Sequence, residues 1–373
     1  MIYLDNSATT APRKEVMDLF YDYSLNHFYN PSSVYSKAVE VKRDIFSCKE
    51  RLLSLLNASK SDNIIFTGSA TEANNLALIG SVRKNKKILI SLGEHPSVFE
   101  TAKYLQNQGY SVEFINLAKE GAVDLDDLKQ KMDNTVGLVS IIHVSNETGA
   151  INDLKAIGKI IKQINPNCIF HSDGVQAFGK VKENLLDWGV DLYTMSSHKI
   201  HGPKGVASLY VKSGVNLKPI VFGGGQENGL RSGTENPAGI MAYTLASEIM
   251  YHDFEKKRAH IKELKTEFLA KLNETKLSYI INGENTLENI ISVSFLGVKG
   301  EVLLHTLEKH GIMLSTGSAC SSKTVGNRVL SSIGLDKKQM EGNIRISFSE
   351  FNTFEEVNKL VDVLTKEIKA LVR

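Results

Sequence analysis

The sequence predicts an α/β protein: a large domain built on a mostly parallel β-sheet, followed by a smaller α+β domain at the C-terminal end. The chain of 373 residues is longer than one hydrophobic core usually serves, which favours two domains. Short apolar segments alternate with helical patterns between residues 63 and 211, as is typical of a parallel sheet. Beyond residue 235 the pattern changes to a long helical stretch and then to a shorter mixture of strands and helices.

The elements of the large domain, 13–255, follow from apolar periodicity and turn residues. Helices are expected at 13–26 and 35–56. The alternating region is expected to contain strands at 63–67, 87–91, 111–116, 136–144 and 168–171, two strands flanking residue 199, and helices at 71–85, 97–108, 125–132 and 154–164. Ligands of such sheets bind at the carboxyl ends of the strands, so the loops that follow the strands are the expected place of a site.

The smaller domain is expected to comprise residues 1–12 and 256–373. The stretch 235–273 reads as predominantly helical. It is followed by strands at 290–295, 312–315 and 344–347 and a helix at 302–310. Thr353 and Glu356 form a capping box for the terminal helix, so that helix is expected to begin there.

Composition favours a globular protein: 42% of the residues are hydrophobic and 23% are charged. A net charge of +2 with interspersed signs argues against a nucleic-acid or membrane surface. Cys48, Cys168 and Cys320 are odd in number and lack a CxxC spacing, which favours free thiols in a reducing compartment. No signal peptide and no apolar run of about 20 residues is visible, so we expect a cytoplasmic protein.

Lys199 lies at the centre of the most informative segment, 191–205. Two apolar runs enclose it, and the turn between them carries Ser196 and His198. A lysine held between two strands has a restricted position, and neighbouring hydroxyl and imidazole groups can bind a phosphate. By itself the pattern is also that of a solvated loop lysine.

Four further loops follow predicted strands. Ser69 and Glu72 match a capping box, which places a helix N-terminus and a potential phosphate site after a strand. An ordinary helix cap that binds no ligand has the same sequence pattern. His95, before a proline, can stack on a ligand or simply lie at the surface. Asn146 can hydrogen-bond a ligand or belong to a bare turn. Asp173, at a strand end, can pair with a pyridinium nitrogen or cap a turn.

Cys320 lies among Ser, Gly and Ala residues, which offer little apolar bulk to bury it. An exposed thiol is the better nucleophile candidate, whereas Cys48 and Cys168 read as structural. Arg345 alternates with Ile344 and Ile346 on a strand, so its side chain faces away from theirs, toward a site or toward solvent. No cluster has metal-ligand spacing, and the 223–225 glycine loop lacks the ending of a nucleotide-binding P-loop.

Together these pieces resemble the cysteine desulfurases, pyridoxal phosphate (PLP) enzymes of the class V aminotransferase group with the aspartate-aminotransferase-like fold. The motifs that carry the resemblance span the chain: YLDNSATT, NPSS, FTGSATEANNLA, EH, SNETG, HSDGVQ, SSHKIHGPKG, GGGQENGLRSGTEN, STGSACSS and NIRIS. It implies a fold-type-I large domain with a mostly parallel seven-stranded sheet. Asn228 and Tyr35 depart from the motifs of many relatives.

The resemblance also implies a role for each matching residue. Lys199 is expected to form the covalent link to PLP and His95 to stack on its ring. The other cofactor contacts are implied at Asp173 (ring nitrogen), Gln176 (phenolic oxygen), Asn146, and Ala70, Thr71, Ser196 and His198 (phosphate), with Thr234 reaching the phosphate from the second subunit of a homodimer. Asn146 and Arg345 are expected to orient L-cysteine, and Cys320 to accept its sulfur.

The implied reaction converts L-cysteine to L-alanine and passes sulfur from a Cys320 persulfide to a protein acceptor, such as an iron–sulfur scaffold or a tRNA-thiolation enzyme. Two other readings stay open on the sequence. One is a selenocysteine lyase or another β-eliminating PLP enzyme; the other is a catalytically silent homologue that acts as a scaffold.

Overall fold

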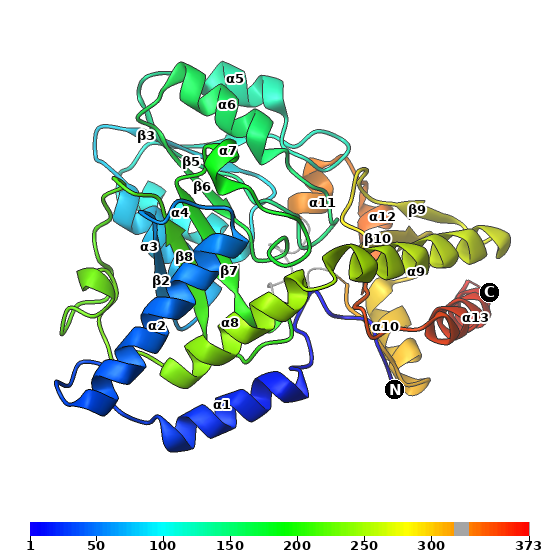
Figure 1. Cartoon of the computed structure of the whole chain (residues 1–373). Coiled ribbons are helices and arrows are strands. Elements are labelled where there is room, and N and C mark those ends of the chain that lie inside the picture. Colours follow the sequence, from blue (N-terminus) through cyan, green and yellow to red (C-terminus); the bar gives the residue numbers. More distant parts are fainter. Residues whose placement is uncertain (317–327, 373) are drawn as a thin grey trace.

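A seven-stranded sheet forms the centre of the larger part of the molecule (Figure 1). The structure, a computed structural model, describes residues 1–316 and 328–372. The strands are, in spatial order, β2 Asn63–Thr67, β8 Ala207–Val211, β7 Leu192–Ser196, β6 Ile169–Asp173, β5 Val136–Ser140, β3 Lys87–Ser91 and β4 Val112–Ile115. Every neighbouring pair is parallel except those of β8, which is antiparallel to β2 and β7. The predicted α/β fold with a mostly parallel sheet is confirmed.

Helices cover both faces of this sheet because successive strand residues point to opposite sides. Ile64 packs into one buried cluster with residues of α2 and α8, and its neighbour Ile65 into another with residues of α3 and α4. The helices of this part are α1 Lys14–Asn26, α2 Ser36–Leu55, α3 Ala70–Ser81, α4 Pro96–Asn107, α5 Leu125–Lys131, α6 Leu154–Ile164, α7 Leu185–Trp188 and α8 Pro237–Tyr251, with short 3₁₀ turns at Ser197–Lys199 and Glu227–Gly229.

A second hydrophobic core lies in the C-terminal part and includes Ile2 and Leu4 from the N-terminus. Its antiparallel sheet has the order β12-β10-β9, and β1 pairs in parallel with β11. The elements are β1 Ile2–Tyr3, α9 Phe254–Glu274, β9 Tyr279–Ile281, β10 Ile290–Phe295, α10 Gly300–Lys309, β11 Ile312–Met313, α11 Arg328–Ser332, α12 Lys337–Glu341, β12 Asn343–Ser347 and α13 Phe354–Leu371. This separate core supports the proposed division into domains.

The structure differs from the sequence-based expectations mainly where elements end. The helix expected to reach residue 85 ends at Ser81, and residues 141–144 leave the regular ladder although His143 still donates to the Asp173 carbonyl at 2.9 Å. The long helical stretch is two helices, because Asp253 adopts a left-handed conformation (φ 54°) between α8 and α9. The Thr353–Glu356 capping box is confirmed.

None of the described helices is long and apolar enough to cross a membrane.

Candidate active site

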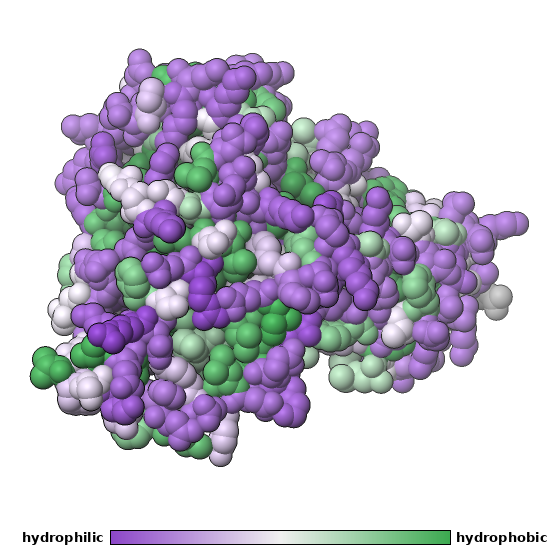
Figure 2. Space-filling view, in the orientation of Figure 1, coloured by the Kyte–Doolittle hydropathy of each residue, from purple (hydrophilic) through white to green (hydrophobic). Residues whose placement is uncertain are grey.

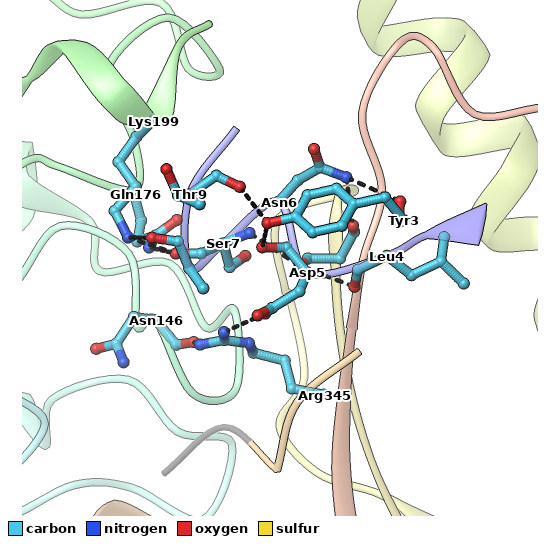
Figure 3. Close-up of polar contacts among 12 residues, drawn as sticks. Tyr3, Leu4, Asp5, Asn6, Ser7, Thr9, Asn146, Gln176, Lys199 and Arg345 are labelled. Carbon is cyan, nitrogen blue, oxygen red and sulfur yellow. Dashed lines mark hydrogen bonds and ion pairs between the residues drawn. The ribbon is translucent and has the colours of Figure 1, made fainter. Parts of the chain in front are cut away.

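Lys199 projects from the turn between β7 and β8 toward the N-terminal segment of the chain (Figure 3). Its Nζ donates hydrogen bonds to the carbonyl oxygens of Ser7, at 2.5 Å, and Ala8, at 2.8 Å. Thr10 secures the same segment, since its N–H and its Oγ1 both donate to the carbonyl of His198. Two carbonyl acceptors therefore hold the amine, and the restricted position expected of Lys199 is observed.

Asp173 ends β6 and is buried at the same edge of the sheet. Asn74 of α3 donates to Asp173 Oδ2 at 2.8 Å, and the N–H of Val175 donates to Oδ1 at 3.0 Å. The Asn74 amide also donates to Ser97 Oγ at 2.8 Å, and that hydroxyl lies 2.8 Å from His95 Nδ1. This chain of contacts fixes the carboxylate and the imidazole relative to each other.

His95 is the N-cap of α4, because its Nδ1 accepts from the N–H of Ser97. Burial lowers the pKa of His95, against the opposing effect of the Asp173 carboxylate. The imidazole is therefore neutral at physiological pH. A neutral ring can stack on an aromatic ligand without bringing a second buried charge to the site.

Arg345 of β12 faces the site. This is one of the two orientations that its alternation with Ile344 and Ile346 predicted; the other was toward solvent. It is 4% exposed, and its guanidinium donates to Asp5 Oδ1 at 2.8 Å and to the backbone carbonyl of Asn146 at 2.7 Å (Figure 3). Its Nε is buried without a hydrogen-bond partner among the described residues. Arg345 thus joins the N-terminal segment, the loop after β5 and the C-terminal part.

The residues predicted to contact a phosphate lie on two elements. Ser69 caps α3 by accepting from the N–H of Glu72, so the first turn, with Ala70 and Thr71, presents free N–H groups. The rest of the capping box is absent, because Glu72 bonds the Gly68 N–H and Arg231 instead. His198 lies in the turn after β7, and burial lowers the pKa of its imidazole to about 4.

The remaining predicted residues lie in different surroundings. Ser196 is buried at the end of β7. Gln176 donates through Nε2 to the Ser7 carbonyl at 2.8 Å, while its Oε1 is buried and has no hydrogen-bond partner among the described residues. Thr234 is exposed on the loop before α8, and its contact with a second subunit stays a prediction. Cys320 lies outside the described residues.

Sequence reasoning missed two parts of this site. The backbone carbonyls of Ser7 and Ala8 carry no side-chain signal, although they lie in the quoted YLDNSATT motif. Glu94 is a fully buried carboxylate that accepts from the Ser91 hydroxyl and the Ile142 N–H, and burial raises its pKa to about 8. Asn74, a polar residue among mostly apolar buried positions of α3, was a signal in the sequence for the group that supports Asp173.

Comparison with known proteins places these observations in a family. Residues 2–360 match the family described as Aminotransferase class-V. A relative from Archaeoglobus fulgidus, named cysteine desulfurase IscS 1, is 39% identical and covers 100% of this chain and 98% of its own. A solved structure named NifS-like protein has a TM-score of 0.93 at 32% identity, covering 99% of this chain and 100% of its own. A structure named SspA in complex with cysteine has a TM-score of 0.82 at 28% identity over 95% and 100% of the two chains.

The chain belongs to the class-V aminotransferase family. Enzymes of this family depend on PLP. The Archaeoglobus fulgidus relative and a Clostridium botulinum relative, 37% identical over 99% of this chain, both carry the name cysteine desulfurase, as the sequence motifs indicated. The described residues suit the cofactor. The first turn of α3 offers N–H donors for a phosphate, Asp173 offers a carboxylate for a ring nitrogen, and the unsatisfied Oε1 of Gln176 is a free acceptor.

We expect the substitution Asp173→Asn to weaken PLP binding by about 10- to 100-fold, since a hydrogen bond to a charged group contributes about 1.5–3 kcal/mol. The amide cannot balance a protonated ring nitrogen, so turnover should fall as well. Titration of the purified variant with PLP, followed by visible absorbance, measures the affinity. The exposed Asp187→Asn is the control and should bind PLP normally. Unchanged affinity in the Asp173 variant would contradict the role.

Proposed function

We infer that this protein is a cysteine desulfurase that converts L-cysteine to L-alanine and retains the sulfur as a persulfide on Cys320. The observation that carries this inference is the convergence of Lys199, Asp173 and Arg345 on one site between the two cores. Full-length similarity to proteins named cysteine desulfurase supports it, as does the similarity to a protein solved with cysteine. The site residues keep the roles predicted for them.

PLP, when bound, supplies an electron sink for the electrons left as the substrate Cα–H bond breaks. Lys199 is the residue placed to accept that proton at Nζ and to return it when alanine forms. The carbonyls of Ser7 and Ala8 accept hydrogen bonds from this amine and restrict its position. Asp173, fixed by Asn74 and Val175, holds a proton on the ring nitrogen.

Arg345 orients the substrate through its carboxylate. Two guanidinium nitrogens already bond Asp5 and the Asn146 carbonyl, which fixes the plane of the group. The buried Nε lacks a partner among the described residues and remains for an incoming carboxylate. A negative group bound there also adds to the charge compensation that Asp5 gives the guanidinium. This arrangement favours an α-amino acid over an amine that lacks a carboxylate.

A homodimer is part of the proposal, with Thr234 reaching the phosphate of the second subunit. Apolar side chains gather over α8 and at the loop between α1 and α2 (Figure 2). In that loop Val34 is 95% exposed and Phe28 71% exposed, and Phe222, on the glycine-rich loop, is 81% exposed. Exposed apolar residues of this size suit a subunit interface.

The sulfur acceptor is proposed to be another protein.

The test is a reaction of the purified protein with PLP and L-cysteine. We expect a yellow protein that forms alanine, with an equal amount of sulfide released when a thiol reductant is added. Selenocysteine in place of cysteine tests the alternative: faster turnover that does not require Cys320 would favour a selenocysteine lyase. A colourless protein that forms no alanine would contradict the proposed function and favour a silent homologue.

A further inference from the structure

Ser97 lies in the first turn of α4, next to His95, and has no role in the mechanism proposed above. Its side chain is buried, as is that of Asn74 on α3. Ser97 Oγ lies 2.8 Å from Asn74 Nδ2, which also donates to Asp173 Oδ2, and 2.8 Å from His95 Nδ1. The backbone N–H of Ser97 donates to the same Nδ1 at 3.2 Å. Four side chains thus form one continuous chain of hydrogen bonds.

The Asp173 carboxylate sets the direction of this chain. A carboxylate only accepts hydrogen bonds, so the part of the Asn74 amide that faces it is the NH₂ group. An NH₂ group has two hydrogens and donates both, so its second contact, with Ser97 Oγ, is also a donation. The Ser97 hydroxyl accepts this hydrogen bond and keeps its own hydrogen. That hydrogen is therefore available to His95 Nδ1.

The backbone N–H of Ser97 decides which way the last contact runs. A hydroxyl by itself can either donate to an imidazole nitrogen or accept from it. A backbone N–H only donates, and that of Ser97 is directed at His95 Nδ1. A hydrogen on Nδ1 would meet this N–H head on, whereas a bare Nδ1 accepts from both groups of Ser97. The proton of the neutral ring therefore lies on Nε2, at the opposite side of the imidazole.

The charged and titratable groups around His95 also favour a neutral ring. Burial lowers the pKa of His95 most strongly, the Asp173 carboxylate opposes this effect, and the cations Lys199 and Arg328 add to it. Burial raises the pKa of the adjacent Glu94 to about 8, so that carboxyl group is mostly uncharged at pH 7. The two donors at Nδ1 act in the same direction, because hydrogen bonds donated to the neutral form of a group disfavour its charged form.

We propose that Ser97, oriented by Asn74, is a positioning residue that holds His95 in its Nε2–H form, so that the ring meets the cofactor and the substrate as a hydrogen-bond donor and not as a base. Ser97 acts through His95 and not on the substrate. The functional meaning rests on the proposed stacking of His95 on the cofactor. Because Nε2 is already protonated, removal of the substrate Cα proton is left to Lys199.

The experiment locates the ring proton by NMR in the full-length protein without cofactor, selectively labelled with nitrogen-15 histidine. Long-range proton–nitrogen correlation separates a protonated ring nitrogen from a bare one, and the variant His95→Gln assigns the signals. At pH 7 we expect a bare, hydrogen-bonded Nδ1 and a protonated Nε2. A proton on Nδ1, or on both nitrogens, would overturn the inference. This measurement on the wild-type protein stands even where a variant does not fold.

Ser97→Ala removes the hydroxyl and keeps the backbone N–H. We expect the ratio of protonated to neutral His95 at a given pH to rise by about fivefold, the effect of losing one hydrogen bond of ordinary strength. Ser97→Thr keeps the hydroxyl and should titrate as the wild-type protein does. If packing alone determined the titration, the bulkier Thr would change it more than Ala. That result, or an unchanged titration in Ser97→Ala, would contradict the role of Ser97.

Ser81→Ala is the matched control. Ser81 is also a buried helical serine, but its hydroxyl donates to the Ala77 carbonyl within α3. Its replacement should lower the stability of the protein and leave the nitrogen signals and the titration of His95 in place. A change in the His95 titration as large as that in Ser97→Ala would show that loss of any buried serine hydroxyl has this effect, and would overturn the inference.

The NMR measurement and the test of the proposed function can fail independently. The spectra require neither PLP nor cysteine. A protein that forms alanine while its His95 carries the proton on Nδ1 overturns this inference and leaves the proposed function in place. A protein with the expected Nε2–H ring that forms no alanine overturns the proposed function and leaves the assignment of the ring proton in place.

Discussion

Lys199→Ala should leave a folded protein that binds PLP only reversibly and makes no measurable alanine from cysteine. Loss of a general base alone lowers turnover by about 10²–10⁴-fold, and loss of the covalent link adds to this. Reduction with borohydride followed by mass spectrometry should find no cofactor attached to the variant, whereas the wild-type protein should carry it at residue 199.

The same substitution should lower stability slightly. The Ser7 and Ala8 carbonyls accept hydrogen bonds from the Lys199 amine, and the substitution removes this donor. A buried carbonyl that loses its donor costs about 1–3 kcal/mol of stability. Water can satisfy part of that loss, so a small change in thermal midpoint is expected. Lys204→Ala, at an exposed position of the same turn region, is the matched control and should keep both colour and activity. A borohydride-reducible chromophore retained in Lys199→Ala would contradict the assignment.

The fold was predictable where its cause is local. Apolar runs bounded by turn residues identified β2 and β3 residue for residue, and the Thr353 capping box located the start of α13. The reversed direction of β8 was not predicted, because strand direction depends on which neighbour pairs with it. The break between α8 and α9 was missed because Asp253, unlike glycine or proline, gives no strong signal for a left-handed residue.

In the candidate site, too, the sequence predicted the features with a local cause and not the contacts between distant segments. Each of its loops follows a strand, so the sequence placed Asp173 and Lys199 at one edge of the sheet. The contacts between distant segments, such as Arg345 with Asp5, come from tertiary packing. The Ser7 and Ala8 carbonyls were invisible, since any residue type supplies a backbone carbonyl. The buried amine of Lys180, which has no hydrogen-bond partner among the described residues, was equally hidden, because burial of a lysine has no pattern in sequence.

Cys320→Ser is expected to keep the yellow colour and to abolish the persulfide. Cys320 itself lies outside the described residues, but the residues on either side of 317–327 are held at the site. Ser315 pairs with Arg345 of β12: the N–H of Arg345 donates to the Ser315 carbonyl at 2.6 Å. Arg328 donates to the carbonyls of Leu92 and Glu94, beside His95, and its guanidinium lies 3.8 Å from the centre of the Phe99 ring.

The described residues on the two sides of 317–327 therefore lie beside Arg345, which is proposed to orient the substrate, and beside His95, which is proposed to stack on the cofactor. Cys48 and Cys168 are buried, and burial raises the pKa of Cys168 to about 12, so neither offers a thiolate at neutral pH. After reaction with cysteine and without reductant, mass spectrometry of the wild-type protein should find the added sulfur on Cys320. Cys168→Ser, the matched control, should form the persulfide normally. Added sulfur on either buried cysteine, or sulfide release by Cys320→Ser at the wild-type rate without reductant, would contradict the assignment.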